Sequence, residues 1–343
     1  MEKQPLPSAM PGADNGTTPA APPLGRYQEV GGRRLLFHQS GVGRPAVVFL
    51  PGAGAVGLDY LNVQQGASEL TTSVVYDRAG TGWSDPVALP RSAAQVVDEL
   101  RDLLVVADVR PPYLLVGHSL GGLYARHYAQ RFPDEVAALL LMDPAHEDYD
   151  AYMPSELSEM RSGWSALIAT ARKQLFRLLN GALAGAVRLA PTRDLLLRLP
   201  AIQYYRRQYR ALFTREMADC PEHVREPLIE RHVSPEWLLV GMREAQNADQ
   251  LYDEVRRAVP MPDIPLIVLC SVDIDDFTRV VSMGRTESLL HEEIEGRRRL
   301  YTMLAGSVPR GELRTVGTGH VTMHLRRPDE ILQAIRDLLA RLT

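Results

Sequence analysis

Short runs of consecutive apolar residues alternate along this chain with segments whose apolar residues recur every three to four positions. Strands that are apolar throughout are typical of a parallel sheet covered on both faces. The expected strands are residues 46–50, 72–76, 113–116, 136–142, 265–270 and 312–316. The expected helices are residues 58–70, 92–106, 123–131, 292–305 and 328–342. This alternation predicts an α/β fold with a mostly parallel central sheet and helices on both faces.

The alternation is absent from three parts of the chain. Residues 1–25 are rich in Pro, Ala, Gly and polar residues and lack the apolar stretch of a signal peptide, so we expect a disordered leader. Two short strands around Gly31-Gly32 are expected to form a hairpin. Residues 148–259 have a helical pattern broken by prolines and are expected to form a lid over an active site. The predicted core is therefore residues 26–147 and 260–343.

Composition narrows the classes of protein that fit. The 343 residues have a formal net charge of -4, which argues against nucleic acid as a partner. The two cysteines, Cys220 and Cys270, cannot form a disulfide framework and are expected to be reduced, which favours a cytoplasmic protein. No uninterrupted run of 18 apolar residues occurs, so a membrane-spanning helix is not expected.

Candidate chemistry begins with Ser119, in the sequence Gly-His-Ser-Leu-Gly-Gly at 117–122. A serine between glycines, with a strand before it and a helix after it, indicates a nucleophile elbow. The tight turn needs small residues at Gly117 and Gly121 and exposes the hydroxyl at the sheet edge. The backbone N–H of Leu120, at the start of the helix, then points to where an oxyanion would form.

A serine hydroxyl needs a base to remove its proton and a third group to orient that base. His320 follows the last predicted strand, in Gly-Thr-Gly-His at 317–320, so its loop should end at the same sheet edge as Ser119. We take His320 as the base and His324 as the fallback, and expect His118 to point into the core or the lid.

The chain resembles the α/β-hydrolase fold family over about residues 26–147 and 260–343. Four motifs carry the resemblance: the elbow at 117–122, Asp-Arg-Ala-Gly-Thr-Gly-Trp-Ser at 77–84, Pro-Gly at 51–52 and Gly-His at 319–320. In that family the residue after the glycine of the third-strand turn donates the second oxyanion N–H. The resemblance therefore implies an oxyanion hole made by Ala53 and Leu120, with Pro51 in place of the usual histidine.

Two positions compete for the acid of a Ser-His-Asp triad. The family most often places the acid after the strand at 265–270, where Asp273 is the first aspartate, although the spacing departs from the common one. Asp143 instead ends the strand at 136–142, an arrangement similar to that of pancreatic-type lipases. Either strand end can reach the back of His320. We favour Asp143 and keep Asp273 as the alternative.

A dinucleotide fingerprint has to be weighed against this interpretation. Residues 52–57 read Gly-Ala-Gly-Ala-Val-Gly between a strand and a helix, and Asp77 follows about twenty residues later, as in NAD-binding oxidoreductases. That interpretation leaves the elbow and the His320 loop without a role, so we rank it below a hydrolase. No metal site is predicted, and the hydrolase chemistry needs no cofactor.

The inserted segment suggests what the substrate is like. Residues 165–200 are apolar with spaced arginines, which favours an amphipathic cap over an element that touches membrane lipids. A Leu-rich lid predicts an apolar acyl or alkyl substrate. The aromatic residues expected to line its pocket are Trp164, Phe176, Tyr204 and Tyr205.

The sequence therefore predicts a serine hydrolase that cleaves a carboxylic ester or thioester of an apolar, small-molecule substrate, free or carrier-linked, through an acyl-enzyme on Ser119. The alternative is a thioesterase, cyclase or acyltransferase that passes the same acyl group to an acceptor other than water. A non-acylating lyase or a binding protein on the same fold is the third hypothesis. Oligomeric state is not predicted.

Overall fold

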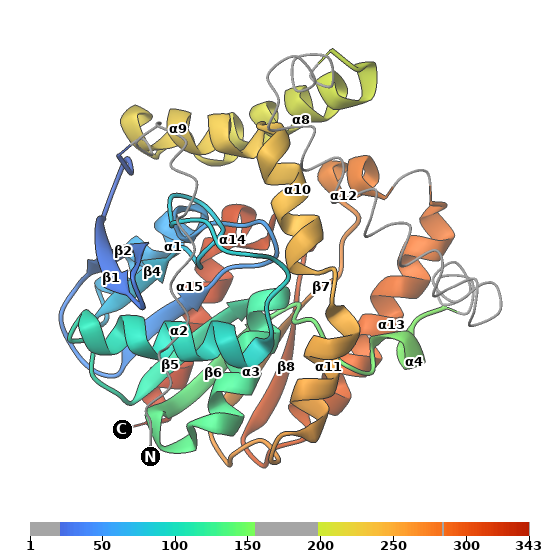
Figure 1. The fold of residues 1–343 in the computed structure, drawn as a ribbon. Helices are drawn as coiled ribbons and strands as arrows, with labels where there is room; N and C mark the ends of the chain where they lie inside the picture. The colour runs from blue at the N-terminus through green and yellow to red at the C-terminus, as the bar shows by residue number, and fades with distance from the viewer. Residues whose placement is uncertain (1–20, 155–197, 283–284, 343) are drawn as a thin grey trace, which may run out of the picture.

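The computed structural model describes residues 21–154, 198–282 and 285–342 (Figure 1). Eight strands form one sheet in the order β1-β2-β4-β3-β5-β6-β7-β8. Their bounds are β1 (Arg26–Val30), β2 (Arg33–Ser40), β3 (Ala46–Leu50), β4 (Ser73–Tyr76), β5 (Tyr113–His118), β6 (Val136–Met142), β7 (Leu266–Ser271) and β8 (Gly311–Val316). β1 and β2 form the predicted antiparallel hairpin, and from β4 to β8 all pairs are parallel. The predicted α/β-hydrolase fold is confirmed.

Alternate side chains of each central strand enter two different cores, as the two-residue period of a strand requires. In β3, for example, Val48 packs with one cluster of buried residues while Val47 and Phe49 pack with the other. Helices α2 (Ala93–Val106), α3 (Leu120–Arg131), α11 (Ala248–Arg257) and α13 (Glu287–Ala305) contribute to the first core. Helices α1 (Leu61–Ser68) and α15 (Pro328–Ala340) contribute to the second, on the other face of the sheet (Figure 1).

The connection between β6 and β7 holds most of the remaining helices. They are α4 (Tyr149–Tyr152), α8 (Pro200–Glu216), α9 (Glu222–His232) and α10 (Pro235–Glu244). Figure 1 shows α8, α9 and α10 beyond one end of the sheet. A Cβ at Gly54, in the turn after β3, would lie 3.1 Å from the Cα of Gly241 in α10. These helices therefore cover the carboxyl ends of the parallel strands.

The predicted lid at 148–259 is not uniform. Its last helix, α11, places Leu251 and Val255 in the core beside α2 and α3, so this helix belongs to the layer that covers the sheet. The apolar period of α11 matches a core helix and a lid helix equally well, which is why the pattern alone put the boundary at 259. Residues 155–197 of this lid, and residues 1–20 of the predicted leader, lie outside the described residues.

Two short helices follow the carboxyl ends of β7 and β8. They are α12 (Asp276–Val281), after β7, and α14 (Met323–Arg326), after β8. Across the described ranges, no helix combines the length and the apolar character needed to cross a membrane.

Candidate active site

Ser119 occupies a strained turn between β5 and α3. Its φ is 51° and its ψ is -119°, a conformation that few non-glycine residues adopt. A Cβ at Gly117 would lie 2.6 Å from the Cα of Gly122, and a Cβ at Gly121 would collide with the carbonyl oxygen of Leu50. The glycines are therefore needed for the close approach of three segments, and the turn has the form of the predicted nucleophile elbow.

His320 reaches Ser119 from the loop after β8. Its Nε2 lies 3.1 Å from the Ser119 Oγ. Asp275, after β7, holds this loop: it accepts hydrogen bonds from the Gly319 N–H at 3.2 Å and from the Thr322 hydroxyl. A Cβ at position 319 would lie 2.5 Å from Asp275 Oδ1, so the close approach requires glycine. The glycine of the Gly-His motif is therefore explained by the close packing of the His320 loop against Asp275.

Asp143 lies behind His320, with its Oδ2 3.2 Å from the His320 Nδ1. Its carboxylate is buried and also accepts hydrogen bonds from the Ser271 backbone N–H, at 2.9 Å, and from the Ser271 hydroxyl. Burial alone would raise the pKa of Asp143, but the positive charge of Arg297 and these hydrogen bonds outweigh it and bring the pKa to about 2. The carboxylate is therefore ionised at neutral pH.

The alternative acid, Asp273, is exposed, and its backbone N–H donates to the carbonyl oxygen of Thr318. Its carboxylate makes no hydrogen bond with His320, so the structure brings Asp143 and not Asp273 to the imidazole. The reason is register: β5 and β6 pair up to His118 and Met142, so the residues that follow them, Ser119 and Asp143, leave the sheet side by side.

The turn after β3 brings backbone donors to the same place. A Cβ at Gly52 would lie 3.4 Å from the Cβ of Ser119. Within the described ranges, neither the Ala53 N–H nor the Leu120 N–H donates a hydrogen bond to the protein. Both N–H groups are therefore without an acceptor in this part of the chain, and Ala53 lines a cavity together with Ser119.

Arg78 and Glu244 hold this turn from beneath. Arg78 donates to the carbonyl oxygens of Pro51, at 2.6 Å, and Gly52, at 2.7 Å. Glu244, at the end of α10, pairs with Arg78 at 2.9 Å and accepts from the Gly54 N–H at 2.8 Å. Both charged side chains are buried, so each neutralises the other in a medium where an isolated charge is costly. The pair fixes the turn and attaches α10 to the core.

His118 is a residue whose role the sequence did not reveal. Its Nε2 lies 2.9 Å from the carbonyl oxygen of His320, so this nitrogen is the donor, and its Nδ1 accepts from the Tyr60 hydroxyl at 2.7 Å. Burial and the nearby His320 lower the pKa of His118 to about 3, which keeps the ring neutral. The Tyr60 hydroxyl in turn accepts from the Gly52 N–H at 3.4 Å. This network joins the elbow, the His320 loop and the turn after β3.

His324, the fallback base, does not contact Ser119. Its ring is buried and stacks on Tyr60 with the ring centroids 4.4 Å apart. It therefore supports Tyr60 from behind.

The dinucleotide fingerprint has a structural explanation. The Asp77 carboxylate is buried and accepts from the N–H groups of Gly57, at 2.7 Å, and Trp83, at 2.8 Å. A Cβ at Gly57 would lie 2.7 Å from the backbone nitrogen of Tyr76. Asp77 therefore closes the turn at 77–84 and is not available to a ribose. Among the described residues, no three His, Cys, Asp or Glu side chains are grouped as metal ligands would be.

Two cavities meet at Ser119 and His320. The larger, about 320 Å³, extends toward α13 and has both apolar and charged walls, with Ala145, Ile294 and Arg297 among its lining. The smaller, about 160 Å³, lies under the cap next to Ala53 and is walled by Tyr209, Phe213 and Trp237.

The aromatic residues predicted to line the pocket are not the three that wall the smaller cavity. Tyr204 is 47% exposed and lines neither cavity, which corrects the prediction for it. It lies five positions before Tyr209, about 140° away around α8, whereas Tyr209 and Phe213 are four apart and share a face. Trp164 and Phe176 lie outside the described residues, and the side chain of Tyr205 is not described.

Comparison with known proteins agrees with this architecture. The model of the alpha/beta hydrolase family matches residues 47–334. The chain therefore belongs to the alpha/beta hydrolase family and has its fold. The uncharacterized protein YbdG of Bacillus subtilis (strain 168) is 31% identical over 121 residues, which are 35% of this chain and 37% of YbdG. The chain spans less than half the length of the first curated relatives it matches.

Solved structures cover nearly the whole chain at lower identity. A thermophilic esterase from Thermogutta terrifontis superposes with a TM-score of 0.53 at 17% identity, over 92% of this chain and 98% of the esterase. A meta-cleavage product hydrolase, CumD, from Pseudomonas fluorescens IP01 superposes with a TM-score of 0.56 at 15% identity, over 94% of this chain and 99% of CumD. These likenesses establish the fold alone.

Proposed function

We propose that this chain is a serine hydrolase that cleaves a carboxylic ester or thioester through an acyl-enzyme on Ser119. The observation that carries the proposal is the continuous chain of contacts from the Ser119 Oγ to His320, at 3.1 Å, and from His320 to the ionised Asp143, at 3.2 Å. In this order the His320 Nε2 can accept the serine proton while a proton on Nδ1 is donated to Asp143, as a serine nucleophile requires.

The reaction follows from these positions. As the Ser119 Oγ bonds to the substrate carbonyl carbon, its proton passes to the His320 Nε2, and the carbonyl electron pair moves onto oxygen. The N–H groups of Ala53 and Leu120 stabilise that oxyanion, a contribution of about 3 kcal/mol for one such donor. The carbon–leaving group bond then breaks, and His320 returns its proton to the leaving oxygen or sulfur. Water, deprotonated by His320, repeats the sequence and releases the carboxylic acid.

Asp143 stabilises the imidazolium that forms in each half of the reaction and keeps the neutral ring with its proton on Nδ1. The aromatic wall of the smaller cavity supports an apolar group on one side of the scissile bond. No step in this scheme needs a cofactor.

Partitioning between two acceptors tests the acyl-enzyme. We expect p-nitrophenyl and phenyl esters of the same acid, hydrolysed in the presence of methanol, to give the same ratio of methyl ester to free acid, because both pass through one intermediate. Ser119→Ala should abolish both products. A ratio that changes with the leaving group would contradict a common intermediate, and methyl ester formed in large excess over acid would favour the acyltransferase alternative.

A further inference from the structure

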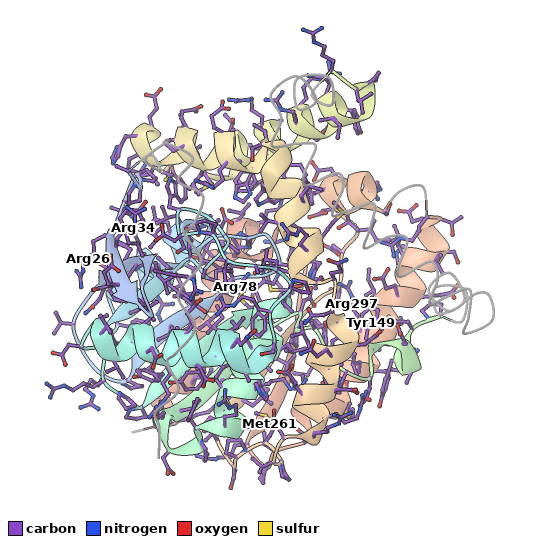
Figure 2. The ribbon with its side chains drawn as sticks, viewed as in Figure 1. Arg26, Arg34, Arg78, Tyr149, Met261 and Arg297 are labelled. Carbon is purple, nitrogen blue, oxygen red and sulfur yellow. The ribbon has the colours of Figure 1, made fainter. Side chains whose placement is uncertain are left out.

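Arg297 is a buried cation whose hydrogen-bond donors have no acceptor in the part of the chain that the structure describes. It lies on α13 and lines the larger cavity together with Ser119 and Tyr149. Figure 2 labels Arg297 and Tyr149. Its side chain is only 11% exposed, and the buried Nε has no hydrogen-bond partner. Among the described residues, none accepts a hydrogen bond from the Arg297 guanidinium. An arginine in this state loses hydration without gaining bonds in return, which is costly unless something else occupies the site.

Asp143 does not satisfy the hydrogen-bond donors of Arg297. The closest approach between them, from Nη1 to Oδ2, is 3.7 Å, which is an ion pair without a hydrogen bond. The Asp143 oxygens already accept from Ser271 and His320. The guanidinium is thus near the carboxylate but is not bonded to it.

Neighbouring arginines of this protein show the contrast. Arg285, which lines the same cavity, donates to Glu293 at 2.6 Å and to the Ser282 carbonyl oxygen at 3.1 Å. Arg126, buried elsewhere, forms two hydrogen bonds of 2.8 Å with Glu147. Both of these cations bind a carboxylate through hydrogen bonds, although the Arg126 Nε, like that of Arg297, lacks a partner. Among the described residues, no carboxylate accepts a hydrogen bond from Arg297.

The carboxylates that line the cavity leave the N–H groups of Arg297 without a hydrogen-bond acceptor. Glu293 is neutralised by Arg285 and also accepts from the Tyr149 hydroxyl at 2.7 Å. Asp143 offsets part of the Arg297 charge as an ion pair at 3.7 Å, but it accepts no hydrogen bond from the guanidinium. Among the described residues that line this cavity, Arg297 is therefore the cation whose N–H groups have no acceptor, and Ser119 lines the same cavity.

We propose that Arg297 binds a carboxylate of the substrate, so that the preferred ester is anionic on the side that enters the larger cavity and apolar on the side that enters the smaller one. This proposal rests on the hydrolase function proposed above and specifies its substrate class. The planar guanidinium suits a carboxylate because two parallel N–H donors match its two oxygens.

Matched esters test the proposal without knowledge of the natural substrate. On the acyl side, p-nitrophenyl hexanoate is compared with the mono-p-nitrophenyl ester of adipic acid, which has the same chain length and a terminal carboxylate. On the leaving-group side, phenyl acetate is compared with 3-acetoxybenzoate. We expect kcat/KM for the anionic member of one pair to exceed that of its neutral partner by at least about 10-fold, as charge-assisted hydrogen bonds allow.

Variants assign the preference to one side chain. Arg297→Gln should reduce the anionic-to-neutral ratio of kcat/KM by about 10-fold or more, chiefly through KM for the anionic ester, and Arg297→Lys should restore part of it. Arg298→Gln is the matched control because Arg298 is the next residue on α13 and is 54% exposed. The ratio cancels any effect that Arg297 has on Asp143, since both esters use the same triad.

The outcomes separate the two proposals. A ratio of one or less in both pairs, or a ratio that Arg297→Gln leaves unchanged, overturns the carboxylate site. If that result comes with normal turnover of the neutral esters and normal fluorophosphonate labelling of Ser119, the hydrolase function stands. Failure of all four esters together with absent labelling overturns the hydrolase function and the carboxylate site with it. If Arg297→Gln does not fold, the test compares the anionic-to-neutral ratio of kcat/KM between the wild type and Arg297→Lys.

Discussion

Asp143→Asn is expected to lower kcat toward an activated ester by about 10⁴-fold, the scale seen when a triad aspartate becomes an amide. The amide NH₂ would donate to the His320 Nδ1 and drive the ring proton to Nε2, so that the imidazole could no longer accept the Ser119 proton. The loss should appear in kcat and kcat/KM alike, since the Asp143 carboxylate opposes a charge that forms only during the reaction.

Asp273→Asn is the matched control, because it removes an aspartate from the family's more common position while leaving the contacts of His320 intact. It should keep kcat within about twofold of wild type, as surface substitutions usually change little. A large loss in Asp273→Asn with a small loss in Asp143→Asn would reverse the assignment of the acid. Thermal unfolding of both variants separates loss of chemistry from loss of the fold.

His320→Ala is expected to lower kcat by about 10⁶-fold, because removing the base of such a triad costs nearly as much as removing the whole triad. The Ser119 hydroxyl would then have no acceptor for its proton. Steady-state kinetics with a p-nitrophenyl ester measure the loss, with Ser119→Ala as the baseline.

His324→Phe is the control for this variant. Phenylalanine keeps a flat ring against Tyr60 and removes the His324 Nδ1, which is buried without a partner among the described residues. Because His324 also lines the smaller cavity, kcat should change by far less than in His320→Ala, and the fold should remain stable. Loss of activity in His324→Phe comparable to that in His320→Ala would mean that the wrong histidine has been assigned as base.

The sheet and the tight turn that holds Ser119 could be predicted because their signals are local. Apolar runs such as 136–142 favour buried strands in a covered sheet because they alternate with helical segments, and the glycines at 117–122 permit one tight turn. The position of His320 after the last strand was enough to bring it near Ser119, because carboxyl ends of parallel strands share an edge. The start of the helix expected at 92–106 is equally local, because the Ser92 side chain caps α2 by accepting from the Gln95 N–H.

The choice between Asp143 and Asp273 depended on register, which the sequence leaves open. Ion pairs between residues far apart in the chain could not be predicted either. Arg78 and Glu244 are 166 residues apart, and the sequence around each residue gives no sign that they form a pair. Arg297 begins a run of three arginines that has the composition of a solvated helix face. Only the packing of α13 against the sheet separates the buried Arg297 from the exposed Arg298.

Labelling with a fluorophosphonate probe, followed by peptide mass spectrometry, tests the central claim most directly, since the probe reacts with a serine hydroxyl that a neighbouring base has activated. The account predicts one adduct, on the peptide that contains Ser119, and no adduct in Ser119→Ala or His320→Ala. Labelling that persists in Ser119→Ala, or a wild-type protein that takes up no probe, would contradict it.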